Sequence, residues 1–283
     1  NQRFIISADN FLIPFEALLS KPNGTKNNFL VFNHSFSYAY SANVHFKVLP
    51  SRFSFTDKML GVAPVNYNSN LRVSSLKGAD VSLNKIETNY FGGKKLIKNE
   101  ASKVNFLSKL ADYQIIQLFT HGTSLGENEQ PSIYFNDNVL DLNELYGLQQ
   151  ISAKLVVLSA CETGIGTTAD GEGIQSLARG FSFLGVPSLV STLWSVDNKA
   201  TYQLTENFYS YLAAGKSKDE ALQLAKIDYL TNEAFFTPYY WAGMVLIGNE
   251  TPLKTFSYGW LVAGLCLSLV CIFAYKYYKK VRK

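Results

Sequence analysis

Two near-continuous apolar runs constrain the fold of this chain more than any other feature. One extends from Tyr113 to Phe119 and is followed by His121; the other extends from Lys154 to Ser159 and is followed by Cys161. Apolar runs of this length, bounded by polar residues and glycine, are typical of strands in a parallel sheet that is covered on both faces. Functional groups of such sheets gather just beyond the carboxyl ends of the strands. Two adjacent strands would therefore bring a histidine and a thiol together.

A histidine beside a thiol is suited to nucleophilic catalysis. The thiolate is the nucleophile, the imidazole holds or shuttles its proton, and the two groups need to be close only in space. The residues alone leave a second interpretation open, in which Cys161 is a buried structural thiol and His121 is unrelated to it. The other cysteines, Cys266 and Cys271, lie in a hydrophobic segment near the C-terminus, so the body of the chain has no internal disulfide.

The charge distribution argues against a nucleic-acid-binding protein. The chain has 283 residues, of which 47% are hydrophobic, enough for a sizeable core. Its 26 basic and 22 acidic residues give a net charge of +4, but five of the basic residues lie within 276–283. The preceding residues therefore carry 21 basic against 22 acidic groups, or −1. Because the body is neutral, we expect no nucleic-acid partner.

A hydrophobic segment before the basic tail predicts a membrane anchor. Residues 259–275 contain no charged residue and are flanked by aromatic residues, as at a membrane interface. A buried C-terminal helix is the alternative. By the positive-inside rule, the tail at 276–283 is cytoplasmic and residues 1–255 lie outside, in the periplasm if the source is a bacterium. The chain starts at Asn1 without a signal peptide, so we expect it to be the C-terminal part of a longer protein.

Apolar runs alternate with helical patterns along the body. This alternation predicts an α/β sandwich with a mainly parallel sheet. Asp197 is expected to cap one helix, Gly215 to end it, and residues 217–220 to form a capping box for the next. The expected strands are 3–7, 29–32, 59–65, 94–97, 113–119, 132–135, 154–159, 188–193 and 240–247, and the expected helices are 99–110, 141–148, 172–184, 198–214 and 218–231.

An ordered set of short blocks resembles one family over about residues 1–250. These blocks are similar to those of the CHAT domain, a caspase-like group of bacterial cysteine peptidases often found downstream of tetratricopeptide repeats. The resemblance implies a caspase-haemoglobinase fold in residues 1–250, a juxtamembrane linker at 251–258 and upstream helical repeats. The blocks are IPFEAL at 13–18, GVAP at 61–64, FTHG at 119–122, LSACETG at 158–164, GEG at 171–173, STLWSVD at 191–197 and YYWA at 239–242.

The resemblance also assigns roles to the predicted pair. The catalytic histidine of the family falls on His121 and its nucleophile on Cys161, with backbone N–H groups at Gly122 and Cys161 as oxyanion donors. In some related peptidases an acidic residue two before the cysteine helps to bind a basic side chain. Here that residue is Ser159, which puts a preference for Arg or Lys in doubt.

Candidates for the substrate pocket are Asp197, Trp194 and Glu162, with Glu172 also nearby in the sequence. Each has a structural alternative: Asp197 as a helix cap, Trp194 as core, Glu162 as a loop charge and Glu172 as a helix N-terminal residue.

Other motifs predict no cofactor or metal. Residues 164–169 fit G-x-G-x-x-A, but no acidic residue follows at the spacing of a dinucleotide site, and residues 215–217 lack the earlier glycine of a phosphate loop. His34 and His45 are expected to be structural or exposed, because scattered histidines without clustered carboxylates or cysteines make no zinc site.

The leading hypothesis is a membrane-anchored cysteine endopeptidase that acts on a protein or peptide substrate. The alternative is a catalytically silent scaffold that keeps the caspase-like fold to bind a partner. A weaker third hypothesis is a transferase or ligase that forms an acyl-thioester at Cys161.

Overall fold

The computed structural model describes most of the body of the chain. Cys161, Glu162, Glu172 and His45 lie outside the described residues, as do the predicted membrane span at 259–275 and the basic tail at 276–283. No helix within the described ranges combines the length and apolar character needed to cross a bilayer. These ranges are residues 2–7, 13–21, 24–40, 57–88, 92–123, 130–159, 167–169, 173–175, 177–195, 197–233 and 236–253.

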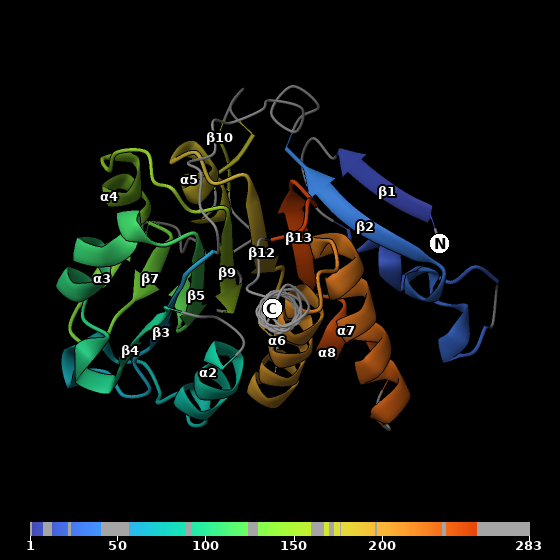
Figure 1. Ribbon diagram of the computed structural model, residues 1–283, viewed down its shortest axis with the longest axis horizontal. Coiled ribbons are helices and arrows are strands. Elements are labelled where there is room, and N and C mark those ends of the chain that lie inside the picture. Colours follow the sequence, from blue (N-terminus) through green and yellow to red (C-terminus); the bar gives the residue numbers. More distant parts are fainter. Residues whose placement is uncertain are drawn as a thin grey trace, which may run out of the picture.

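An eight-stranded sheet forms the centre of the molecule (Figure 1). Strand β12 pairs antiparallel with β13, and every other neighbouring pair in this sheet is parallel. The predicted α/β architecture with a mainly parallel sheet is therefore confirmed. In spatial order the strands are β1 (Gln2–Ser7), β2 (His34–Ala39), β13 (Met244–Gly248), β12 (Ser188–Thr192), β9 (Leu155–Ser159), β5 (Ile115–Phe119), β3 (Met59–Ala63) and β4 (Lys94–Ile97).

Helices cover both faces of this sheet and create two apolar cores (Figure 1). Alternate residues of a strand point to opposite faces, so Ile115 and Phe119 of β5 enter one core, while Ile116 and Leu118 enter the other. The first core also contains side chains of α2 (Ala79–Glu87), α6 (Asn198–Ala213), α7 (Lys218–Asn232) and α8 (Pro238–Trp241), and the second contains those of α3 (Lys103–Lys109), α4 (Leu142–Tyr146) and α5 (Leu177–Phe183).

Two small sheets and six 3₁₀ helices complete the described elements. Strands β6 (Gly122–Thr123), β7 (Ser132–Tyr134) and β8 (Val139–Asp141) form one small sheet, so the strand predicted at 132–135 lies outside the central sheet. Strands β10 (Thr167–Ala169) and β11 (Gly173–Gln175) form the other. The 3₁₀ helices are η1 (Phe15–Ala17), η2 (Lys26–Asn28), η3 (Leu30–Phe32), η4 (Ser69–Leu71), η5 (Lys98–Glu100) and η6 (Leu110–Asp112).

Three predicted elements are wrong in position or type. Residues 29–32 do not form a strand: they turn through η3 and bury Phe29 and Val31, while the strand is the following β2, in which polar and apolar residues alternate. The strand predicted at 240–247 begins only at Met244, after α8. The helix predicted at 172–184 begins at Leu177, because residues 173–175 pair as β11. Helix α2 was not predicted.

The predicted helix ends are partly confirmed. Asp197 caps α6 by accepting a hydrogen bond from the Ala200 N–H at 3.0 Å, and Gly215 follows the helix with a φ of 83°. The predicted capping box of α7 is wrong. Ser217 occupies the N-cap position, but Arg3 donates to its hydroxyl at 3.0 Å and its side chain bonds to no helix N–H. The Ser217 hydroxyl instead bonds to charged side chains, those of Arg3 and Asp219.

Candidate active site

The two apolar runs that end near His121 and Cys161 form adjacent parallel strands. Phe119, the last residue of β5, lies directly opposite Ser159, the last residue of β9. His121 follows Phe119 by two residues, and Cys161 follows Ser159 by two residues in the sequence. The predicted adjacency of these strands is confirmed, whereas the position of Cys161 itself lies outside the described residues.

The imidazole of His121 is held in one orientation by a backbone carbonyl. Its Nε2 lies 2.7 Å from the carbonyl oxygen of Ser74. A carbonyl oxygen only accepts hydrogen bonds, so Nε2 must carry a proton and donate it. In the neutral ring, Nδ1 is then the unprotonated nitrogen. The ring also lies beside that of Tyr67, with the two centroids 5.2 Å apart. His121 therefore has a defined tautomer with one basic nitrogen free of the Ser74 contact.

Hydrogen bonds also hold the backbone around His121. The buried hydroxyl of Thr120 bonds to the carbonyl of Tyr134 and lies 3.1 Å from the hydroxyl of Tyr67. The Tyr134 N–H donates to the His121 carbonyl at 3.0 Å. Burial raises the pKa of Tyr67 to about 12, so its hydroxyl stays protonated at neutral pH. These contacts connect His121 to the end of β3 and to β7.

The segment that supplies Ser74 and Tyr67 begins with a strained turn just after β3. Val65 has a φ of 63°, a left-handed conformation that is rare for a β-branched residue, and the Asn66 N–H reaches back to the Pro64 carbonyl at 2.7 Å. Sequence analysis missed both Ser74 and Tyr67. Their place in the chain could have indicated that they lie near His121, because they follow β3, which ends beside β5.

The N–H of Gly122 makes no hydrogen bond to the neighbouring strand of the small sheet. Because Tyr134 donates to the carbonyl of His121, the Gly122 and Ile133 pair is of the non-hydrogen-bonded kind in an antiparallel ladder. The Gly122 N–H consequently points away from β7. The role of Gly122 as an oxyanion donor stays a prediction, because Cys161 lies outside the described residues.

Ser159 directs its hydroxyl into the interior. The Gln117 amide donates to Ser159 Oγ at 3.0 Å, and Thr205 Oγ1 on α6 lies 3.2 Å from the same atom. All three side chains are buried. The residue two before Cys161 is therefore part of a hydrogen-bonded layer beneath the strand ends and presents no charge to solvent.

The remaining pocket candidates lie after β12. Strand β12 is parallel to β9, with Ser191 opposite Leu158, so its end reaches the same edge of the sheet as His121. Trp194 is half-buried there, and its indole N–H donates to the Tyr239 carbonyl at 2.8 Å. Asp197 serves as the cap of α6. Glu162 and Glu172 lie outside the described residues, so their place in a substrate pocket stays a prediction.

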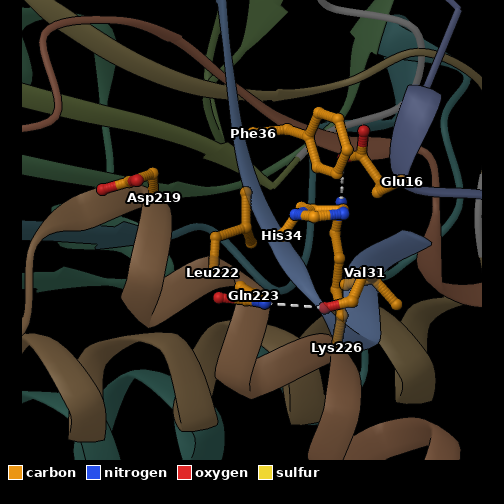
Figure 2. A pocket seen from close by; sticks show the side chains of 8 residues that line it. All are labelled: Glu16, Val31, His34, Phe36, Asp219, Leu222, Gln223 and Lys226. Carbon is orange, nitrogen blue, oxygen red and sulfur yellow. Dashed lines mark hydrogen bonds and ion pairs between the residues drawn. The ribbon is translucent and has the colours of Figure 1, made fainter. Parts of the chain in front are cut away.

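His34 belongs to a separate buried cluster between β2 and α7 (Figure 2). Lys226 of α7 forms an ion pair with Glu16 at 2.5 Å. Both residues, together with His34, line a small cavity of about 10 Å³. Strand β2 is four strands from β5, or about 19 Å at the usual strand spacing. His34 is thus too distant to act with His121. No group of three His, Cys, Asp or Glu residues in the described ranges could hold a metal ion.

Solved structures of two other proteins share this architecture. The chain is similar to the separase of the Saccharomyces cerevisiae separase–securin complex, with a TM-score of 0.53 and 15% identity over 83% of this chain and 14% of that one. It is also similar to gingipain R, an Arg-specific cysteine proteinase, with a TM-score of 0.56 and 8% identity over 89% of this chain and 64% of that one. At such identities the likeness shows the fold, which is the caspase-like α/β fold.

Within that class the family is defined by sequence: the chain belongs to the CHAT domain family, whose model matches residues 3–249. Tetratricopeptide repeat protein 28 is 35% identical over 107 residues in Mus musculus and over 119 residues in Homo sapiens. These matches cover 38% and 42% of this chain, and about 4% of each relative. The chain therefore matches only a small part of these much longer proteins.

Proposed function

We propose that this protein is a caspase-like cysteine endopeptidase in which His121 and Cys161 form the catalytic pair. The observation that carries the proposal is the register of β5 and β9. Because Phe119 and Ser159 lie opposite each other, the residues two positions further along leave the same edge of the sheet on neighbouring strands. Neighbouring strands are about 4.8 Å apart, close enough for an imidazole and a thiol to meet.

In this reaction His121 Nδ1 takes the proton of the Cys161 thiol, and the thiolate attacks the scissile carbonyl carbon. The Gly122 N–H stabilises the oxyanion that forms. The C–N bond then breaks as the imidazolium returns the proton to the leaving amine. Water hydrolyses the resulting thioester, which releases the new carboxyl end and restores the thiol. The Ser74 carbonyl supports these steps by keeping the proton on Nε2.

The proposal is tested by covalent labelling of the full chain with a panel of peptidyl ketones that differ in the side chain next to the ketone. Intact mass reports the adduct, and Cys161→Ala identifies the labelled residue, because Cys266 and Cys271 are retained. His121→Ala should slow the labelling by about 100-fold or more, since it removes the base.

Two outcomes would contradict a peptidase. One is labelling no faster than that of a free thiol across the whole panel, including in a protein that retains any upstream repeats. The other is labelling that is equally fast in His121→Ala. Both would favour the alternative of a non-catalytic scaffold. Peptide products that retain a transferred acyl group would instead favour a transferase or ligase.

Membrane attachment is a separate part of the proposal. It is supported by the uncharged segment at 259–275 and the basic tail at 276–283, with the catalytic domain outside the cytoplasm. A reporter cysteine placed after Lys283 tests the orientation. An impermeant thiol reagent added to intact cells should leave this cysteine unlabelled, and labelling from outside would overturn the proposed orientation.

A further inference from the structure

An open groove with a volume of about 680 Å³ separates α2 from α6. The two helices cover the same face of the sheet (Figure 1), and their facing residues include Ser82 on α2 and Tyr202 on α6. A volume of this size is in the range of sites that bind small molecules or peptide side chains. Asp197, the cap of α6, lines this groove and is one of the predicted pocket residues, whereas the other lining residues were not predicted.

The groove is connected to the strand that leads to His121 through Tyr202. The ring of Tyr202 packs edge-on against that of Phe119, with centroids 5.3 Å apart, and Phe119 precedes His121 by two residues. On its other side, Tyr202 lies against Gly78, where a Cβ atom would stand only 3.4 Å from the ring. Tyr202 therefore packs both on β5, two residues before His121, and on the start of α2.

Two hydroxyl groups in the groove lack hydrogen-bond partners. Ser82 is only 2% exposed, and within the described part of the chain its Oγ has no partner. The buried Oη of Tyr202 has none there either. Burial raises the pKa of Tyr202 to about 12, which keeps the group a hydrogen-bond donor at neutral pH. Buried polar groups in native proteins are nearly always paired, so these two hydroxyls are free to donate to a ligand that accepts hydrogen bonds.

The charges around the groove favour an anionic ligand. Helix α2 starts at Gly78 with no side chain capping it, and Asp80 in its first turn offsets part of the positive end of its dipole. Lys77 and Lys199 line the groove and form no ion pair with any described residue. The acidic lining residues are already engaged: Glu206 pairs with Lys85 at 3.0 Å, and Asp197 caps α6.

We propose that this groove binds a carboxylate side chain of the peptide substrate, close to the scissile bond. Ser82 and Tyr202 donate hydrogen bonds to the carboxylate, and Lys77 and Lys199 at the rim contribute positive charge. The inference rests on the proposed peptidase function and adds to it the class of substrate: peptides with an acidic residue near the cleavage position.

Matched peptide probes test this inference in the full chain. Tetrapeptidyl chloromethyl ketones carry either Glu or Gln at one of their four positions, and the rate constant for labelling Cys161 is measured by intact mass. At one position, the Glu probe should react at least about tenfold faster than its Gln partner, the effect expected for hydrogen bonds to a charged group.

Three variants locate this preference in the groove. Ser82→Ala and Tyr202→Phe each delete one unpaired hydroxyl and should bring the Glu to Gln ratio toward one, while the Tm stays the same or rises. Lys109→Ala, on the opposite layer of the molecule, is the control and should leave the ratio unchanged.

The outcomes separate the two proposals. A ratio of one at every position overturns the groove assignment, and so does a Glu preference that persists in both Ser82→Ala and Tyr202→Phe. In both cases Cys161-dependent labelling would leave the peptidase proposal intact. If no probe labels Cys161, the peptidase proposal fails and the inference fails with it.

Discussion

At the scale of single residues, Lys218 is the side chain with the clearest conflict between burial and charge. It opens α7, is only 2% exposed, and donates from Nζ to the Thr251 carbonyl at 2.6 Å. Burial lowers its pKa to about 8 from 10.5, against the attraction of Glu250 and Asp57. A cation at the start of a helix is also opposed by the helix dipole. The folded state therefore binds this proton less tightly than the unfolded state does.

This difference makes stability depend on pH. Between about pH 8 and pH 10.5 the unfolded chain retains the Lys218 proton and the folded chain has lost it, so the free energy of unfolding rises with pH. Lys218→Met removes the proton. Urea unfolding measures how much more stable this variant is than wild type. This difference in the free energy of unfolding should be largest at pH 7, and at pH 10.5 it should be smaller by up to about 3 kcal/mol. A difference independent of pH would contradict the lowered pKa.

At the scale of elements, two glycines that both have a positive φ occupy very different surroundings. Gly248 ends β13 with a φ of 96°, and a Cβ atom there would lie 2.2 Å from the Pro187 carbonyl oxygen. Gly215 follows α6 with a φ of 83°, and nothing lies within 4 Å of the corresponding position. The strain of a side chain at positive φ is common to both, whereas the collision with backbone occurs only at Gly248.

The two alanine variants should therefore differ in stability. Gly215→Ala should lower the free energy of unfolding by about 1 kcal/mol, the cost of the left-handed conformation. Gly248→Ala should lower it by about 3 kcal/mol or more, because the pairing of β13 with β12 must also shift. Urea denaturation of both variants gives the comparison. Equal losses would mean that the β13 end relaxes freely around the added atom.

At the scale of the whole molecule, buried charges attach the N-terminal segment to α7. Glu16 in η1 and Lys226 in α7 are 210 residues apart in sequence and form an ion pair of 2.5 Å, to which Tyr38 adds a hydrogen bond at 2.5 Å. Burial lowers the pKa of Lys226, although Glu16 opposes the shift. Arg3 likewise reaches Asp219 at 2.6 Å. Removing one partner would leave an uncompensated buried charge.

A double-mutant cycle tests this attachment. Lys226→Met alone should lower the free energy of unfolding by about 3 to 5 kcal/mol, because Glu16 is left buried without its cation. Adding Glu16→Gln should recover most of the loss, since the amide oxygen still accepts from Tyr38 and no charge remains. Chemical denaturation of the two single variants and the double variant gives the coupling. Additive losses would show that the two side chains act independently.

What the sequence determined by itself is the pair of buried strands β5 and β9. An apolar run such as 113–119 or 154–159 is stable only where both its faces are covered, so local composition was enough to predict β5 and β9. It was not enough for residues 29–39: the hydrophobic effect is non-directional, so the apolar residues at 29–32 are buried from a 3₁₀ helix as readily as from a strand.

The tertiary structure alone decided which groups surround His121. The Ser74 carbonyl, the Tyr67 ring and Tyr134 come from segments that extend from 54 residues before the histidine to 13 after it, and no local pattern specifies that they meet. Strand order, the antiparallel β12 and β13 pair and the groove between α2 and α6 have the same origin. Hydrogen bonds and close packing are directional and depend on distant partners, so they are settled only when the whole sheet and its helices assemble.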